Sequence, residues 1–151
     1  MKGNIRLLSP EEFRNCGSIW DMEKHSQLAA RFYSELVAGE RITFVYERDG
    51  LFLGEISLKK ETNDPDYTLP GQRIYVSRLI VKPEERRKGI GKTLVEYAIR
   101  QAISMGFSEL SIGVDIDNYP ALKLYADEGF REILFVGEDK DGRYMKLLKR
   151  L

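Results

Sequence analysis

The sequence predicts one mixed α/β domain in which a single sheet carries helices on its faces. Apolar runs with strand-like spacing alternate with segments whose apolar residues recur every three to four positions, in the order β-α-α-β-β-β-α-β-α-β-β. A length of 151 residues suits one domain over residues 1–151, and 42% hydrophobic with 32% charged residues is ordinary for a globular protein. The strand–helix–strand unit in this order should cross in the right-handed sense.

The amino-terminal part predicts a strand followed by two short helices. Residues 4–8 form a short apolar run. Ser9-Pro10-Glu11-Glu12 then supplies the cap, the first-turn proline and the capping-box glutamate of a helix start. Two helices fit residues 10–38, and Gly39 ends the second.

The middle of the chain predicts a hairpin, a long loop and a third strand. Residues 42–47 and 51–59 are strands joined by Arg48-Asp49-Gly50, a turn typical of hairpins. Residues 60–72 are polar and contain two prolines, which predicts a loop, and residues 74–81 form the next strand. The remaining elements are a helix at 91–105, a strand at 109–114, a turn at 115–118, a helix at 120–128 and hairpin strands at 130–138 and 143–148.

The most informative segment is Arg86-Arg87-Lys88-Gly89-Ile90-Gly91-Lys92-Thr93, which joins a strand to a helix. This arrangement binds phosphate, because glycines let the backbone approach an anion and the first helical amides lack partners. Two known phosphate loops do not fit. A Walker A loop needs glycine where Arg86 stands, and a Rossmann fingerprint needs a third glycine where Leu94 stands.

A third pattern, Arg/Gln-x-x-Gly-x-Gly/Ala, is filled by Arg86, Gly89 and Gly91. Further on comes Asn118-x-x-Ala121-x-x-Leu124-Tyr125-x-x-x-Gly129-Phe130. Together these motifs resemble the acetyl-CoA loop and the second signature of the GNAT superfamily of N-acetyltransferases, over about residues 74–130. The resemblance implies a mostly antiparallel sheet of about seven strands flanked by about four helices, with a splayed parallel strand pair that holds the cofactor.

The resemblance also implies an enzyme that moves the acetyl group of acetyl-CoA to a primary amine by direct attack in a ternary complex. Asn118 would bond to the cofactor arm and Tyr125 would both contact the cofactor and protonate the departing thiolate. A tyrosine is protonated at neutral pH and can therefore donate. The remaining residues implied to bind the cofactor are Leu79, Ile80 and Val81 for the pantetheine arm, and Arg86, Arg87, Lys88, Gly89, Ile90, Gly91 and Lys92 for the pyrophosphate.

The general base is where this chain departs from the family. Many relatives carry a glutamate on the strand close to where this chain has Ser77 and Arg78, and neither of these is a suitable base. Glu55 on the preceding strand and Asp115 are the candidates. An α-amine, whose pKa is about 7.7–8.0, would need little help from a base.

Several interpretations stay open beside these. Tyr125 also fits a core position, Asn118 also fits a helix cap, and the acidic residues 61–66 form a solvated loop or attract a cationic amine. The alternative to an enzyme is a non-catalytic module that binds or senses acyl-CoA, and a longer acyl group is compatible with the same motifs.

Composition excludes several classes of partner. Lys+Arg and Asp+Glu balance at 24 each, so nucleic acid is not expected, and no apolar run approaches the ~20 residues that span a bilayer. The single cysteine, Cys16, excludes an internal disulfide and a cysteine-rich metal site, so no metal is expected.

No signal peptide is recognisable, which predicts a cytoplasmic protein. The acceptor is a small-molecule amine or a protein amino group, and family members are frequently homodimers.

Overall fold

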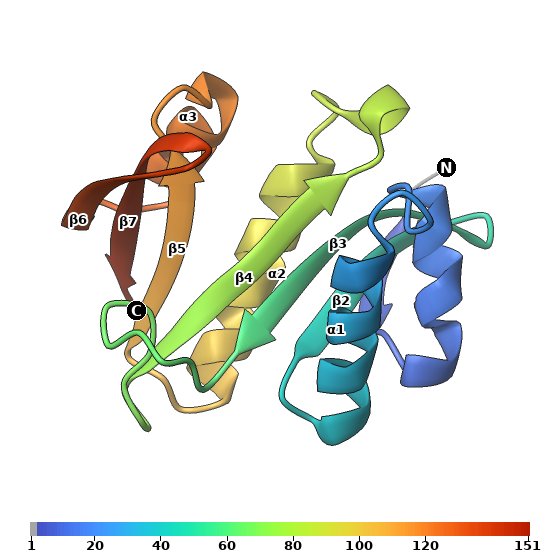
Figure 1. Ribbon diagram of the computed structural model, residues 1–151, viewed down its shortest axis with the longest axis horizontal. Helices are drawn as coiled ribbons and strands as arrows, with labels where there is room; N and C mark the ends of the chain where they lie inside the picture. Colours follow the sequence, from blue (N-terminus) through green and yellow to red (C-terminus); the bar gives the residue numbers. More distant parts are fainter. Residues whose placement is uncertain (1–2) are drawn as a thin grey trace. The chain divides into compact units, whose positions relative to one another are not determined.

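A computed structural model describes residues 3–151, whose strands form one seven-stranded mixed sheet in the order β1-β2-β3-β4-β5-β7-β6 (Figure 1). The strands are β1 (Asn4–Leu7), β2 (Ile42–Arg48), β3 (Leu51–Lys59), β4 (Arg73–Val81), β5 (Glu109–Asp115), β6 (Glu132–Asp139) and β7 (Gly142–Arg150). The helices are α1 (Ser26–Ala38), α2 (Ile90–Ser104) and α3 (Tyr119–Asp127), with the 3-10 segments η1 (Pro10–Ser18) and η2 (Pro83–Glu85). The predicted class, a mixed and mostly antiparallel sheet flanked by helices, is confirmed. Within residues 3–151, no helix is long and apolar enough to cross a membrane.

The predicted helix starts and turns follow local chemistry. Ser9 and Glu12 form the reciprocal capping box, although the segment that they open is a 3-10 helix rather than an α-helix. Gly39 ends α1 with φ +76°, where a left-handed backbone favours glycine. In the β2–β3 hairpin, Asp49 and Gly50 have φ values of 54° and 79°, the two positive angles of a primed two-residue turn. The short segment η2 was not predicted.

The described chain divides into two compact units, each described by itself below. The amino-terminal unit contains the chain up to Leu58 together with Arg78–Tyr97, and the carboxy-terminal unit contains Lys59–Ser77 and Ala98–Leu151. Both β4 and α2 contribute residues to each unit. One domain over residues 1–151 stays a prediction.

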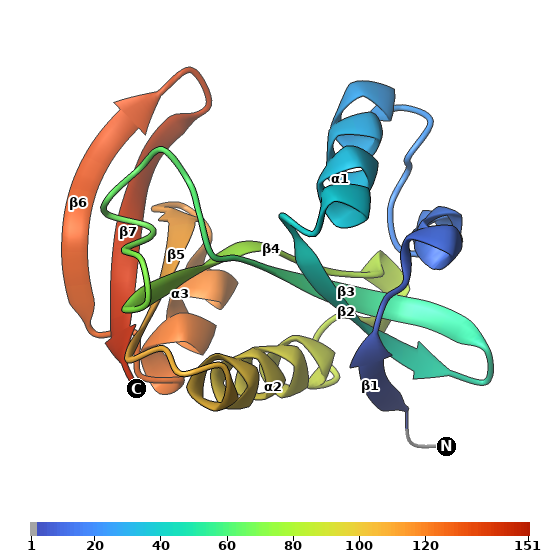
Figure 2. The same ribbon diagram turned by 90° about the horizontal axis from the view of Figure 1, so that it is seen from below.

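In the amino-terminal unit, α1 and the start of α2 lie on opposite sides of β2 and β3 (Figure 2). Gly54 on β3 makes the close approach of α2 possible. A Cβ at this position would come within 3.2 Å of Ile90 Cγ2 and 3.1 Å of Leu94 Cδ1. The opposite face is covered by a cluster of buried residues from η1, α1 and the strands: Leu8, Phe13, Cys16, Ile19, Trp20, Phe32, Leu36, Val45 and Phe52. These contacts fix where α2 begins.

In the carboxy-terminal unit, β4 and β5 run parallel, with Arg73–Val76 in register with Glu109–Ile112. β5 and β6 both pair with β7 in antiparallel fashion. The long loop before β4 is held on this sheet by Tyr67. The Tyr67 ring stacks on Tyr75 with centroids 4.1 Å apart, and the Tyr67 hydroxyl occupies the space that a side chain at Gly113 would need.

Candidate functional site

The loop between η2 and α2 has the backbone of an anion cradle. Gly89 has φ +90° and a Cβ there would meet nothing within 4 Å, while Arg87 has φ 65°, an angle that costs a non-glycine residue about 1–2 kcal/mol. Strain of this kind persists where the surrounding structure enforces it, and it gathers at ligand-binding sites. The Gly89 carbonyl accepts from the Thr93 amide at 3.0 Å and from the Thr93 hydroxyl at 2.9 Å, so the glycine turn leads directly into α2.

The positive charge of the loop is only partly neutralised by the protein. Lys88 Nζ lies 3.6 Å from Glu85 Oε2. Within the described residues, Arg86, Arg87 and Lys92 have no carboxylate in ion-pair range, and all three are exposed. Arg86 has a structural contact as well, because its Nε donates to the Val81 carbonyl at 3.0 Å. The loop therefore offers cations and helix-start amides to an anion.

The end of β4 is held firmly beside this loop. Val81 and Ile90 are buried, and Ile80 packs against the buried cluster of the amino-terminal unit. The Lys82 amide donates to the Leu53 carbonyl of β3 at 2.8 Å. Because the Ile90 side chain points into the core, only its backbone amide is available to a ligand.

Glu55, the first candidate base, is buried against Arg78. The Glu55 side chain is on β3 and the residue is 2% exposed, and its Oε1 lies 3.4 Å from Arg78 Nε on β4. Glu55 Oε2 and Arg78 Nε are buried atoms without a hydrogen-bond partner among the described residues. Burial raises the pKa of Glu55, although Cys16, Arg78 and Trp20 act in the opposite direction. A raised pKa makes the Glu55 carboxylate a stronger proton acceptor.

Cys16 reaches the same carboxyl group from η1. It is fully buried, and burial followed by the nearby Glu55 charge raises the pKa of its thiol far above the ordinary value. The thiol is therefore neutral at physiological pH and is a poor nucleophile. No motif in the sequence indicates that Cys16 and Glu55 lie close together.

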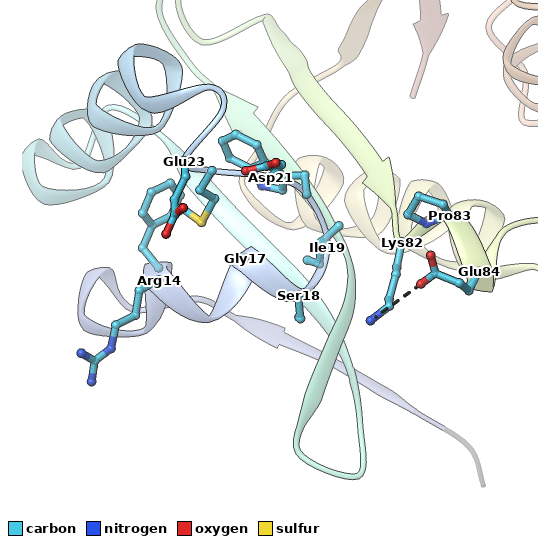
Figure 3. Close-up of a pocket in the computed structure, with 12 residues that line it drawn as sticks. Arg14, Gly17, Ser18, Ile19, Asp21, Glu23, Lys82, Pro83 and Glu84 are labelled. Atoms are coloured by element: carbon cyan, nitrogen blue, oxygen red, sulfur yellow. Dashed lines mark ion pairs between the residues drawn. The ribbon is translucent and has the colours of Figure 1, made fainter.

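A pocket of about 770 Å³ opens between the end of η1 and the turn after β4 (Figure 3). Phe13, Ile19, Trp20 and Met22 supply apolar and aromatic walls. The charged lining consists of Arg14, Lys82, Asp21, Glu23 and Glu84, with Lys82 and Glu84 paired at 3.8 Å. The size and the mixed lining are typical of a site for a small organic molecule.

Tyr125, the predicted proton donor, lies on α3 in the carboxy-terminal unit and is 6% exposed. Its ring meets Phe130 edge-on with centroids 5.8 Å apart, so the core interpretation is confirmed as part of its role. Burial, with a smaller contribution from Tyr75, raises the pKa of Tyr125 to about 12. Its hydroxyl therefore keeps its proton throughout the physiological range.

Asn118 caps α3, as one of its two interpretations predicted. Its Oδ1 accepts from the Ala121 amide at 3.3 Å. The side-chain amide group of this exposed residue still has donors for a ligand. Asp115, the second candidate base, is the exposed last residue of β5.

The acidic segment before β4 is partly neutralised by the protein itself. Lys146 Nζ on β7 lies 2.6 Å from Asp64 Oδ2 and 3.1 Å from Asp66 Oδ2, and also over the rings of Tyr67 and Phe135. Burial alone would raise the pKa of Asp64, but the hydrogen bonds from Lys146 and from the Asp66 amide lower it. These two carboxylates share the single charge of Lys146 and hold the loop on β7.

Replacing Lys146 by methionine should destabilise the protein by about 2 kcal/mol at neutral pH, because the Asp64 and Asp66 carboxylates lose a charged donor. Guanidinium unfolding of K146M against the matched surface variant K140M measures this. Because folding lowers the pKa of Asp64, its carboxylate stabilises the fold at pH values above the ordinary pKa of 3.8. This stabilisation is lost as the pH falls through the lowered pKa. The difference between K146M and the wild type should therefore shrink in acid. An equal loss in both variants, or one independent of pH, would contradict this.

A family model and several curated relatives all identify this chain as similar to acetyltransferases. The sequence model of the Acetyltransferase (GNAT) family matches residues 5–130. N-acetyltransferase family 8 member 3 of Rattus norvegicus is 32% identical over 108 residues, which are 72% of this chain and 46% of the relative. GCN5-related N-acetyltransferase 4, chloroplastic, of Arabidopsis thaliana is 42% identical over 59 residues, 39% of this chain and 20% of that protein. The chain thus spans less than half the length of these curated relatives.

Solved structures share the whole fold. The PaiA N-acetyltransferase from Thermoplasma acidophilum in complex with coenzyme A superposes with a TM-score of 0.71 at 21% identity, covering 100% of both chains. The ribosomal-protein-S18-alanine N-acetyltransferase from Escherichia coli gives a TM-score of 0.77 at 17% identity, over 98% of this chain and 93% of that one. At these identities the likeness establishes the fold alone. With the match of the family model to residues 5–130, the chain belongs to the acetyltransferase (GNAT) family.

Proposed function

We propose that this protein is an N-acetyltransferase that moves the acetyl group of acetyl-CoA to a primary amine. The observation that carries the proposal is the segment from Arg86 to Lys92. Before the start of α2 it holds a left-handed glycine and two arginines without a carboxylate partner among the described residues. A pyrophosphate is the anion that such a loop accommodates, with the first amides of α2 as additional donors. Backbone groups of Leu79, Ile80 and Val81, and the amide of Asn118, would hold the rest of the cofactor.

Acetyl-CoA supplies an activated thioester, and the chain supplies the proton transfers. The neutral amine attacks the carbonyl carbon, a carbon–nitrogen bond forms and the carbon–sulfur bond breaks. Glu55 accepts the proton that the amine must lose, directly or through water, and Tyr125 donates a hydrogen bond to the departing thiolate. A backbone amide near Ile80 or Val81 would stabilise the carbonyl oxygen.

Direct transfer without a covalent acyl-enzyme is supported by the state of the only thiol. Cys16 is fully buried, and its raised pKa keeps it protonated. A ternary complex is therefore the simplest kinetic scheme, and it predicts intersecting rather than parallel initial-rate plots.

Gly89→Ala should weaken acetyl-CoA binding about tenfold, since a left-handed alanine costs about 1–2 kcal/mol and 1.4 kcal/mol is a factor of ten. Isothermal titration of both proteins with acetyl-CoA measures this. Gly50→Ala is the matched control, because Gly50 also has a positive φ and open space but lies in the β2–β3 hairpin. The free G89A loop can relax to a negative φ and must regain the left-handed angle to bind, so only G89A should lose affinity.

If the wild-type protein does not bind acetyl-CoA at millimolar concentration, the proposed function is wrong. If it binds acetyl-CoA but releases no thiol with any amine in a broad screen, it is an acyl-CoA-binding module rather than an enzyme. A similar loss of affinity in G50A and G89A would remove the loop from its role.

A further inference from the structure

Arg78 is a largely buried cation whose guanidinium has few hydrogen-bond acceptors among the described residues. Its side chain on β4 is 20% exposed, and its Cζ lies 4.5 Å from the centre of the Trp20 ring and 5.3 Å from that of Phe32. Among the described residues its one polar contact is Glu55 Oε1, 3.4 Å from Nε, and that Nε makes no hydrogen bond. A guanidinium has five donors, so most of those of Arg78 are without a protein acceptor.

Arg73, five residues earlier on the same strand, is a buried arginine whose guanidinium donates to several protein acceptors, as expected for a structural role. The Arg73 side chain is 11% exposed, and it donates to Glu109 Oε1 at 2.9 Å, to the Asp66 carbonyl at 2.8 Å and to the Pro65 carbonyl at 3.3 Å. A buried cation is normally compensated in this way, because removal from water is costly. In place of these acceptors, Arg78 has two aromatic rings and a single carboxylate contact at 3.4 Å. Burial lowers the pKa of Arg78, and Glu55 offsets this only in part.

The pair of Glu55 and Arg78 presents a negative and a positive group side by side. The Glu55 carboxyl group is faced by Arg78 of β4, by Cys16 of η1 and by Trp20, which follows η1. The charge of Arg41 also acts on this carboxyl group. Glu55 Oε2 and Arg78 Nε are buried polar atoms that have no hydrogen-bond partner among the described residues. Adjacent opposite charges match a molecule that carries an ammonium and a carboxylate close together.

Trp20 connects this pair to the pocket of Figure 3. The ring over which Arg78 lies belongs to a residue that also lines the pocket of about 770 Å³, with Phe13, Ile19 and Met22 as apolar neighbours. A pocket of this volume has room for the body of a small amine beyond its charged end.

We infer that Arg78 binds a carboxylate of the acetyl acceptor, so that the acceptors are amines with a neighbouring carboxylate, of which α-amino acids are the simplest. The ammonium of such an acceptor lies toward Glu55 and its side chain lies in the pocket lined by Trp20. The acetylation of this ligand rests on the proposed function, whereas its binding does not require acetyl-CoA.

The test uses the only tryptophan of the chain, Trp20, as a reporter. Its fluorescence is titrated with three pairs of probes, each an amino acid and the amine that lacks its carboxylate: alanine and ethylamine, phenylalanine and phenethylamine, lysine and cadaverine. In the wild-type protein at least one amino acid should bind about tenfold or more tightly than its amine, as expected for a charge-assisted contact.

Arg78→Met should remove this preference, and Arg78→Lys should restore part of it, because lysine keeps the charge without the planar fork. Arg131→Met is the control, since Arg131 is an exposed cation that does not line this pocket and its loss should leave the preference unchanged. A thermal melt establishes that each variant is folded. The wild-type preference and the R78K result decide the question even if R78M does not fold.

The inference is wrong if no probe pair shows a preference for the carboxylate in the wild-type protein, or if R78M keeps the preference. It is also wrong if R131M abolishes the preference as completely as R78M, since that would indicate a general effect of the protein's charge. Each result is independent of acetyl-CoA affinity, so failure of the proposed function and failure of this inference are distinguishable.

Discussion

Tyr125→Phe should lower turnover about 100-fold while leaving acetyl-CoA affinity unchanged. Loss of a positioned proton donor typically costs 10²–10⁴-fold. We expect the lower end, because the pKa of Tyr125 is raised to about 12 by its burial. Transfer of its proton to a thiolate whose conjugate acid has a pKa of about 8.5 is uphill by about 5 kcal/mol. Tyr125 therefore stabilises the leaving group chiefly as a hydrogen-bond donor.

Thiol release at saturating acetyl-CoA measures the turnover of Y125F, and isothermal titration measures its affinity. Tyr119→Phe is the matched control, since Tyr119 lies on the same helix but is 72% exposed, and it should retain full turnover. Because Tyr125 does not titrate near neutral pH, Y125F should have the same pH profile as the wild type at a lower rate. Unchanged turnover in Y125F would leave Tyr125 as a core residue only.

Glu55→Gln should lower kcat/KM by about 100-fold or more near neutral pH and should change the shape of the pH profile. A base acts only when deprotonated, so the wild-type rate should fall in acid, with its midpoint above the ordinary carboxyl range because burial raises the pKa of Glu55. Glutamine cannot titrate, so the acid limb should disappear in E55Q. This change of shape separates E55Q from Y125F.

Asp115→Asn is the control for E55Q, because Asp115 is the other carboxylate that the sequence offered as a base. D115N should keep both the rate and the acid limb. If D115N loses the acid limb while E55Q keeps it, Asp115 is the base. If both variants keep it, the acceptor reacts as a neutral amine without a protein base. A thermal melt of E55Q is needed as well, since its substitution leaves Arg78 without its carboxylate.

Patterns among residues close together in the sequence predicted most of the fold. The Ser9–Glu12 capping box, the Asp49–Gly50 turn and the glycine ends of the helices depend on residues within four positions of one another. Helical and strand periodicities gave the type of every long element, and the observed ends differ by only one or two residues. The one difference in type, a 3-10 rather than an α-helix at η1, lies in a segment of nine residues that includes Asn15 and Gly17, both weak helix formers.

Contacts between distant segments were not predictable in the same way. Lys146 lies 82 positions from Asp64, and no local pattern identified it as the partner of the acidic loop. Glu55 and Arg78 are both visible as strand residues, but only the pairing of β3 with β4 sets them opposite each other. A register slip of one residue would turn either side chain to the other face of the sheet.

The sequence by itself therefore indicated the family and the loop proposed to bind the cofactor, because the backbone angles and charges of such a loop are local properties of consecutive residues. The tertiary structure decided which charges are compensated. Packing of η1 and α1 on the strands buries Glu55, Arg78 and Cys16 together, and burial strengthens every charge that lacks a partner. The inference about the acceptor rests on this buried ion pair, in which Glu55 Oε2 and Arg78 Nε have no hydrogen-bond partner among the described residues, and not on a motif.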